Sequence, residues 1–196
     1  MLSIQNYYTN KYRALNFKNL SEQDFVLLHH WLNLPHVRSF YQAQPIALAE
    51  VKRKYQTRVE SNSPIRCFII YLDRLPIGYI QTYLIKDAAD YANAIATDKG
   101  ATIDLYIGDV AWLNRGLGWL IELKFLKEIV FQIFSIDECY ISHDLENIAA
   151  LKASKKAGFI YLRNYIEGDR ENMLLFNTRA NVFSLLPSYE VCTTRA

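Results

Sequence analysis

Short apolar runs, some of them alternating with polar residues, mark the predicted strands of this chain. The first run covers 15–20 and reads Leu-Asn-Phe-Lys-Asn-Leu, a period of two that is typical of a strand with one buried face. The other runs are short and bounded by turn residues. Strands are therefore expected at 15–20, 66–72, 77–84, 102–107, 137–141, 159–165 and 172–177. The last two are expected to form a closing hairpin.

Helices are expected where apolar residues recur every three to four positions. Ser21, with Asp24 three residues on, resembles an N-cap for a helix that buries Phe25, Leu28 and Leu32. Further helices are predicted at 47–61, after Gly116 and at 145–157, with Gly158 as a left-handed C-terminal cap. The inward-facing residues of the helix after Gly116 would be Leu117, Leu120, Ile121, Phe125, Ile129 and Ile133.

Mixed strands and helices with several adjacent strand pairs predict one α/β domain. Its sheet is expected to be mixed but mostly antiparallel, with helices on both faces. The expected organisation is a loose lead-in at 1–14, the domain at 15–179 and a tail at 180–196. The apolar tail segment 182–187 could pack against the domain or a second subunit. Loops are expected around 35–41 and at 86–100, and long loops are often functional.

Composition narrows the possible functions. Hydrophobic residues make up 51% of the 196 residues and charged residues 21%, which favours a packed core over disorder. A net charge of +2 is too small to argue for nucleic acid or an anionic membrane, and neither is expected as a partner. No apolar run or N-terminal pattern predicts a membrane span or signal peptide. No metal is predicted, because the three cysteines lack metal-ligand spacing and His29–His30 has no third ligand. The simplest location is the cytosol.

The segment 102–118 carries the clearest chemistry. A strand ends at Gly108, and a loop with Gly116 and Gly118 opens the next helix. Free backbone N–H groups at the start of a helix bind anions such as a pyrophosphate, although the loop could also be a plain helix-start turn. Asp104 lies on the preceding strand, on one face with Thr102 and Tyr106. It is a candidate general base, and its alternative role is a salt bridge at the strand end.

Two motifs resemble those of the GNAT acyltransferase family. Leu113–Gly118 fills the family pattern Arg/Gln-x-x-Gly-x-Gly/Ala, with a leucine at its first position. Asn147 opens a helix that ends in Lys156–Phe159, which matches the family's Lys-x-Gly-Phe. The resemblance covers about residues 15–179 and implies the GNAT fold, acetyl-CoA as co-substrate and an amine acceptor.

Smaller features resemble the aminoglycoside 6'-N-acetyltransferases. They are Trp31–Asn33, Phe40–Tyr41, Pro76–Tyr79 with Gln81 and Tyr83, and Ile103–Asp104. The siderophore hydroxylysine acetyltransferases share much of this pattern. The acceptor site implied by the resemblance comprises Phe40, Tyr41, Gln81, Tyr83, Asp90, Asp104 and Asp169. Ser142 stands where relatives often carry an acid, and nearby Asp144 could substitute.

The resemblance also implies how acetyl-CoA is held. The pyrophosphate would lie against the amides of Asn114, Arg115, Gly116, Leu117 and Gly118. Asn147 would contact the pantetheine arm or simply cap its helix, and Lys152 would reach nucleotide phosphates or remain solvated. An amide near Ile107 would hold the thioester oxygen, with the pantetheine lying where two neighbouring strands separate after Asp104.

Ser154 stands where many relatives carry a tyrosine that protonates the leaving sulfur. A serine is a far weaker acid, but a thiol of pKa about 8.5 scarcely needs one. Ser154 could hydrogen-bond the leaving thiolate, or water could protonate it. Asp104 and Ser154 are therefore the two predicted catalytic positions. Cys67 and Cys139 lie off the predicted site, so direct attack by the amine is favoured over a covalent intermediate.

The predicted function is transfer of acetyl from acetyl-CoA to a primary amine of a cationic small molecule, foremost the 6'-amine of an aminoglycoside. Alternatives are acylation of a siderophore hydroxylysine or a polyamine. A CoA-binding regulator without turnover is the alternative of another class, indicated by Leu113 and Ser154. The chain is expected to act as a monomer or homodimer.

Overall fold

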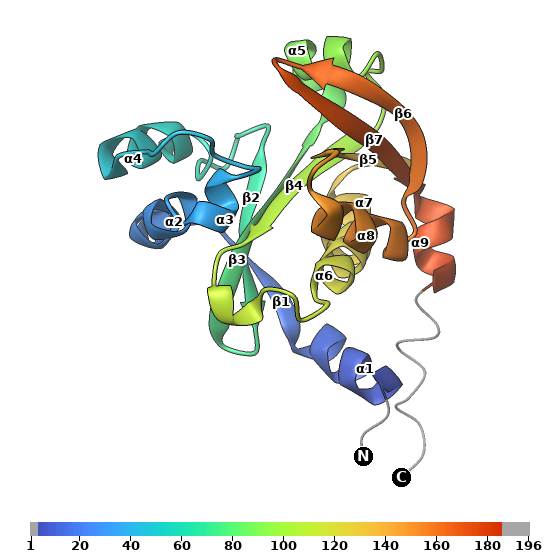
Figure 1. Ribbon diagram of the computed structural model, residues 1–196, viewed down its shortest axis with the longest axis horizontal. Coiled ribbons are helices and arrows are strands. Elements are labelled where there is room, and N and C mark those ends of the chain that lie inside the picture. Colours follow the sequence, from blue (N-terminus) through green and yellow to red (C-terminus); the bar gives the residue numbers. More distant parts are fainter. Residues whose placement is uncertain (1–3, 186–196) are drawn as a thin grey trace.

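The computed structural model describes residues 4–185, and one seven-stranded sheet organises them (Figure 1). The sheet order is β1-β2-β3-β4-β5-β7-β6. The strands are β1 (Leu15–Asn19), β2 (Arg66–Leu72), β3 (Leu75–Leu84), β4 (Ala101–Ile107), β5 (Glu138–Asp144), β6 (Ile160–Glu167) and β7 (Arg170–Thr178). This confirms the predicted mixed, mostly antiparallel sheet, because only β4 and β5 run parallel.

The contact between β4 and β5 is the weakest in the sheet. It consists of two residue pairs, Ala101 with Cys139 and Thr102 with Tyr140, whereas every other pair of neighbouring strands matches over five or more residues. Beyond Thr102 the two strands separate, two residues earlier along β4 than the predicted separation after Asp104 (Figure 1). We call this separation the seam. Asp104 lies two residues beyond the last pair on β4.

Helices cover both faces of the sheet (Figure 1). On one face lie α1 (Ile4–Ala14), α6 (Gly118–Phe125), a π-helical stretch (Leu126–Val130), α7 (Phe131–Ile133), α8 (Ile148–Lys156) and α9 (Arg179–Leu185). On the other face, α2 (Phe25–Leu32), α3 (Pro35–Arg38) and α4 (Leu48–Gln56) cover β2 to β4, and α5 (Ala89–Ala94) covers β5 to β7. Single helical turns occupy Glu22–Asp24, Ile85–Asp87 and Val110–Trp112.

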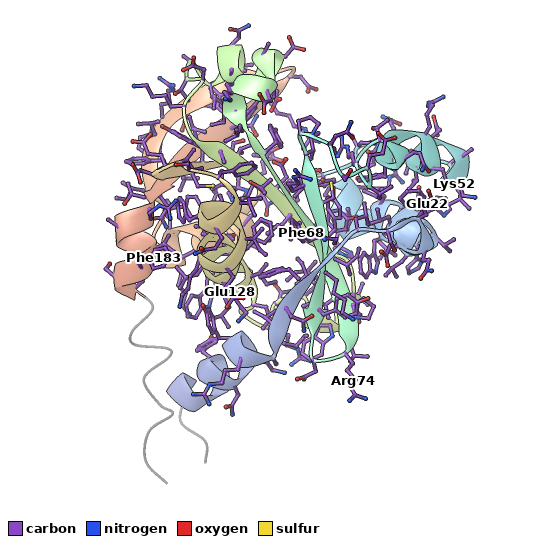
Figure 2. The ribbon with its side chains drawn as sticks, turned by 180° about the vertical axis from the view of Figure 1, so that it is seen from behind. Glu22, Lys52, Phe68, Arg74, Glu128 and Phe183 are labelled. Carbon is purple, nitrogen blue, oxygen red and sulfur yellow. The ribbon has the colours of Figure 1, made fainter. Side chains whose placement is uncertain are left out.

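Separate apolar clusters fill the two faces. The largest packs the sheet against α6, where Phe125 contacts Phe17 and Phe68 edge to face at ring-centroid distances of 5.0 and 5.3 Å. Figure 2 labels Phe68 of this cluster. On the opposite face, Tyr79 and Tyr106 pack under α2 and α4. Side chains alternate between the faces along β4, so Ile103 and Leu105 lie in the first cluster and Tyr106 in the second. Asp104 is thereby placed on the face that carries α2 to α5.

Several predicted details are confirmed. Asp24 Oδ2 accepts a hydrogen bond from the Ser21 amide at 2.9 Å, which is the predicted cap before α2. Phe25, Leu28 and Leu32 are buried as predicted. Gly158 has φ = +90°, the left-handed conformation expected at the end of α8.

Other details were wrong. Residues 4–14 form a helix rather than a loose lead-in. The helix was missed because tyrosines such as the buried Tyr12, not aliphatic residues, form its packing face. Residues 86–100 contain α5, and Pro35 begins a helix within the predicted loop. The helix predicted at 47–61 ends at Gln56.

Two predictions in the C-terminal half of the chain concern Ile133 and the tail. Ile133 was expected inside but is 47% exposed, because the π-helical stretch shifts the helix phase before it. Val182 in α9 is buried against the domain, while 186–187 lie outside the described residues. Across residues 4–185, no helix is long and apolar enough to cross a membrane.

Candidate active site

Asp104 projects from β4 directly opposite Gln81 of β3, on the face predicted from strand alternation. Gln81 Nε2 donates a hydrogen bond to Asp104 Oδ2 at 2.8 Å. Gln81 is itself fixed through its carbonyl oxygen, which accepts from Arg58 at 2.7 Å and from the Tyr79 hydroxyl at 2.7 Å. The carboxylate is therefore held by a network rather than by an ion pair at the strand end.

The environment of Asp104 makes it a stronger base. Burial raises the pKa of its carboxyl group above the usual value, and the hydrogen bond from Gln81 and the positive charge of Arg58 oppose that shift. A carboxylate with a raised pKa takes up a proton more readily near neutral pH. The arrangement fits a general base at the edge of the seam.

Tyrosine rings surround this carboxylate. Tyr79 stacks on Tyr106 with centroids 5.5 Å apart, and Tyr41 meets Tyr106 edge to face at 4.7 Å. Tyr83 packs against Tyr91 of α5 at 6.4 Å. Burial raises the pKa of Tyr41 and Tyr79, so both rings stay neutral. Neutral aromatic faces beside a carboxylate suit a cationic ligand.

On the β5 side, Ser142 lies within hydrogen-bond distance of the hydroxyls of Tyr91 (3.1 Å) and Tyr165 (2.9 Å). Asp144 forms an ion pair with Arg170 at 3.0 Å, so its charge is already balanced and it is poorly suited to replace an acid at Ser142. Glu167 on β6 is near enough to act electrostatically on Asp104, a neighbour that sequence reasoning missed.

The other predicted acceptor residues lie at the surface. Phe40 is 43% exposed beside the packed Tyr41. Asp90 is exposed on α5, and Asp169 is exposed in the β6–β7 turn. The structure brings Tyr41, Gln81 and Tyr83 around Asp104, and it shows no contact of Phe40, Asp90 or Asp169 with that carboxylate, so their role stays a prediction.

The glycine loop follows β4 and a helical turn, Val110–Trp112. Its backbone is left-handed at Asn114 (φ +58°) and Gly116 (φ +68°). The amides of residues 114–118 donate no hydrogen bond to another residue of the described chain. Asn114, Arg115 and Gly116 are exposed. An added Cβ on Gly118 would lie 3.0 Å from the Ala153 side chain of α8. A row of unused amides at the start of a helix, the first three in exposed residues, fits a pyrophosphate.

Helix α1 packs beside this loop. An added Cβ on Gly116 would lie 3.0 Å from the Tyr8 hydroxyl. The Lys156 ammonium lies 4.4 Å from the Tyr8 ring centroid and 4.3 Å from that of Trp119. These cation–π contacts tie α1, α6 and α8 together next to the loop.

Ile107 presents its backbone to the seam. The Gly108 amide donates to the Ile77 carbonyl of β3 at 2.8 Å, so Ile107, the preceding residue, directs its own amide and carbonyl away from β3. The Ile107 carbonyl accepts from His36 Nε2 at 2.9 Å. Asn147 caps α8 by accepting from the Ala150 amide at 3.2 Å, and Lys152 is exposed. Their contacts with acetyl-CoA stay predictions.

Ser154 is fully buried, which sequence reasoning did not foresee. Its Oγ lies 2.7 Å from His143 Nε2 and 3.1 Å from Glu122 Oε1. Neither partner was predicted, because they come from β5 and α6 and nothing in the local sequence links them to α8.

The cysteines do not suit covalent catalysis. Cys67 lies nearer the site than expected, with its sulfur 3.0 Å from the Tyr79 hydroxyl. Burial raises the pKa of both Cys67 and Cys139, which disfavours the reactive thiolate.

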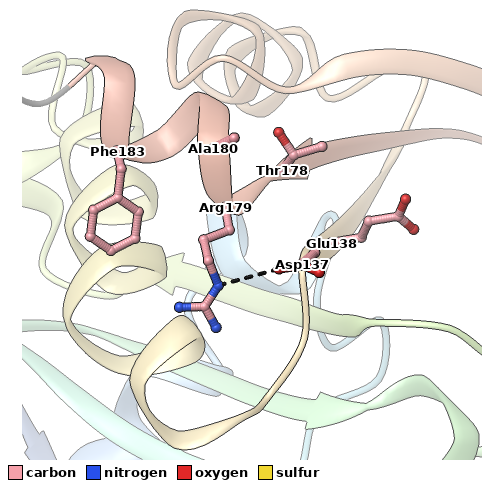
Figure 3. Close-up of a pocket in the computed structure, with 6 residues that line it drawn as sticks. All are labelled: Asp137, Glu138, Thr178, Arg179, Ala180 and Phe183. Carbon is pink, nitrogen blue, oxygen red and sulfur yellow. Dashed lines mark ion pairs between the residues drawn. The ribbon is translucent and has the colours of Figure 1, made fainter.

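A shallow surface pocket of about 530 Å³ lies away from these residues, between the start of β5 and α9. Arg179 and Asp137 form an ion pair within it at 3.5 Å (Figure 3). It contains no predicted site residue, so it does not alter the assignment.

A split sheet, a glycine loop with unused amides and a supported carboxylate fit a group-transfer enzyme with a phosphate-bearing donor. The model of the GNAT acetyltransferase domain matches residues 21–165. The chain therefore belongs to the GNAT acetyltransferase family, as its motifs indicated.

Two curated relatives resemble this chain. They are the aminoglycoside N(6')-acetyltransferases type 1 of Klebsiella pneumoniae and Serratia marcescens. Each is 28% identical over 155 residues, which span 77% of this chain and 76% of the relative.

Solved structures share the fold. The crystal structure of aminoglycoside acetyltransferase AAC(6')-Ib with coenzyme A matches 87% of this chain and 98% of its own, with a TM-score of 0.71 and 23% identity. A protein from Bacillus halodurans matches 90% of both chains with a TM-score of 0.80 and 20% identity. These likenesses confirm the predicted GNAT fold.

Proposed function

We propose that this protein transfers the acetyl group of acetyl-CoA to a primary amine of a cationic small molecule, foremost the 6'-amine of an aminoglycoside. The observation that carries the proposal is Asp104, a half-buried carboxylate among tyrosines at the edge of the seam. The curated relatives named for N(6')-acetylation of aminoglycosides support the choice of acceptor.

Different residues of this chain would bind the different parts of acetyl-CoA. Acetyl-CoA would supply an acetyl group activated as a thioester. The amides of 114–118 would bind its pyrophosphate, and Arg115 would add positive charge nearby. The Ile107 amide, directed away from β3, is the candidate donor to the thioester oxygen. Asn147 and Lys152 of α8 are the remaining candidate contacts.

Asp104 has two tasks. An amine of pKa about 10.4 is mostly charged at neutral pH and must lose a proton before it can attack. The carboxylate first attracts the ammonium group and then takes its proton, directly or through water. Gln81 keeps the carboxylate oriented, and the aromatic rings of Tyr41 and Tyr83 flank the incoming amine. No cysteine of this site takes part, so the amine attacks directly.

The test is an acceptor panel in which thiol release from acetyl-CoA is measured. A kanamycin-like aminoglycoside, a hydroxylysine derivative and a polyamine serve as acceptors. Turnover is expected with the aminoglycoside, and mass spectrometry should place the acetyl group on the 6'-nitrogen. A matched aminoglycoside with a 6'-hydroxyl group is the control and should not react. Turnover with the hydroxylysine derivative or polyamine alone would contradict the choice of acceptor, and CoA binding without any turnover would indicate a regulator.

A further inference from the structure

Three polar side chains meet inside the apolar cluster behind the seam. Glu122 comes from α6, Ser154 from α8 and His143 from β5. Ser154 and Glu122 are only 0% and 2% exposed. Burying polar groups in an apolar core is costly unless they bond to one another, and the hydroxyl of Ser154 bridges the other two. The acceptor site around Asp104 uses none of them.

The protonation states of this cluster favour movement of a proton in one direction. Burial raises the pKa of Glu122 to about 8, so it is mostly a neutral acid at pH 7. Burial lowers the pKa of His143 to about 4, so its ring is neutral. A hydroxyl donates one hydrogen. The Ser154 hydroxyl donates to Glu122 Oε1 when that carboxyl group is ionised. When Glu122 is the neutral acid it can donate to Ser154 instead, Ser154 then donates to His143 Nε2, and Nδ1 carries the hydrogen of the neutral ring.

His143 brings this chain of hydrogen bonds to the seam. Thr102 pairs with Tyr140, so His143 lies three residues beyond the last pair, at the level of Leu105 on β4. The ring is half-buried, and within the described part of the chain its Nδ1 makes no hydrogen bond. Asp104 leaves β4 on the opposite face, so the seam lies between a base on one side and this cluster on the other.

We propose that Glu122, Ser154 and His143 form a proton relay that protonates the sulfur leaving from acetyl-CoA, an inference that rests on the proposed function. His143 is the catalytic member, because its Nδ1 would face the sulfur. Ser154 and Glu122 act through it, so they are relay and positioning residues.

The protons and electrons of the step balance. As the bond from the amine nitrogen to the acetyl carbon forms, the carbon–sulfur bond breaks and its electron pair goes to sulfur. His143 gives its Nδ1 proton to that sulfur, while Nε2 takes the proton of Ser154 and Ser154 takes that of Glu122. The amine proton goes to Asp104. Solvent then returns one proton to Nδ1 of the half-buried His143, Nε2 and Ser154 pass a proton back to Glu122, and solvent removes one proton from Asp104.

The seam creates a need for such a donor. A thiolate in water is stable enough to leave unaided, since its conjugate thiol has a pKa of about 8.5. Between β4 and β5 the leaving sulfur would lie near Leu105 and Ile141, both in the apolar cluster. Burial disfavours a charged sulfur, so protonation during departure lowers the barrier.

The kinetic test compares variants that break the relay with variants that preserve its packing. In Ser154→Ala and Glu122→Gln, kcat is expected to fall about tenfold, while KM for acetyl-CoA stays within about twofold. The loss is smaller than the usual effect of removing a general acid, because a thiolate is a good leaving group. Ser154→Thr keeps a hydroxyl and should retain most of kcat. Cys139→Ala, on the same face of β5, is the packing control and should retain kcat. Unchanged kcat in Glu122→Gln, or equal losses in Ser154→Thr or Cys139→Ala, would overturn the relay.

A second readout needs no turnover. The chain has four histidines, so ¹⁵N spectra of the imidazoles can be assigned, with His143→Gln identifying the relevant signals. His143 is expected as the Nδ1–H tautomer at pH 7, and saturating CoA should shift its Nδ1 resonance. An Nε2–H tautomer, or no response to bound CoA, would refute the relay while leaving acetyl transfer intact. Absence of any CoA binding would refute the proposed function, and the relay with it.

Discussion

Burial disfavours the ionised form of the Asp104 carboxyl group, and the hydrogen bond donated by the Gln81 amide stabilises it. Asp104→Asn keeps the shape and the bond partner but removes the base. We expect kcat/KM for the amine to fall by about two orders of magnitude or more, the usual worth of a general base. Steady-state rates of thiol release measure the loss, and the affinity for CoA should be unchanged.

The matched control is Asp98→Asn, an exposed carboxylate in the segment before β4. Its kcat/KM should equal that of the unaltered protein. A rate in Asp104→Asn equal to that of this control would remove Asp104 from the mechanism.

Arg58 should set the pH range in which Asp104 works. Its guanidinium binds Gln81 and lowers the pKa of Asp104 against the effect of burial. Asp104 must be ionised to accept a proton, so kcat/KM rises with pH through its pKa. Arg58→Met removes the lowering charge, the pKa of Asp104 rises, and the acidic limb of the pH profile should move to higher pH. Arg53→Met, an exposed arginine on α4 shortly before Arg58 in the chain, should leave that limb in place; an equal displacement there would contradict the prediction.

At the scale of single residues, the sequence could predict what alternation along one strand determines. Asp104 faces the site because Ile103 and Leu105 must face the core. Arg58, Glu122 and His143 could not be predicted in this way. Each reaches its partner from a different element, and only the packing of those elements brings the atoms within hydrogen-bond distance.

Among the elements, the loop between β4 and α6 offers a direct test. Gly116 has φ = +68°, and a methyl group there would project next to Tyr8. In Gly116→Ala, strain of about 1–2 kcal/mol favours a different loop conformation. Displaced amides bind phosphate less well, so the Kd for CoA should rise about tenfold, because that strain is comparable to the 1.4 kcal/mol of a tenfold change. Calorimetry measures that affinity.

Gly168→Ala separates backbone strain from binding. Gly168 also has positive φ, +63°, and nothing lies within 4 Å of an added Cβ. The substitution should lower the free energy of unfolding by a similar amount and leave CoA affinity unchanged. Equal losses of affinity in the two variants would show that the glycine loop is not the phosphate site.

Most strands and the larger helices were predictable because each buries a regular apolar face. Several helices were not, among them α3 and α9, which have only four and seven residues. The polar sequence of α1 packs through Tyr8 and Tyr12 instead of an aliphatic stripe, and α5 has six residues, too few to show a helical period.

For the whole molecule, binding of CoA should be visible as stability. A ligand that binds only the folded state at 100 times its Kd adds about 2.7 kcal/mol to the free energy of unfolding. For a protein of this size, that raises Tm by roughly 5–10 °C. Scanning calorimetry with CoA should show this shift, and Gly116→Ala should need more CoA to reach it. No shift at saturating CoA would contradict the assignment of the donor site.

Because only two residue pairs join β4 to β5, the edges of both strands beyond those pairs are free to bind a ligand. β1 to β4 and β5 to β7 are each bonded internally over long registers, so within the sheet two parts are joined by only two residue pairs. A pantetheine arm lying between them would offer amides to edges that otherwise lack neighbours. Bound pantetheine would thus hydrogen-bond to β4 and β5 as a further strand would. Release of CoA would break those hydrogen bonds and leave the two edges unpaired again.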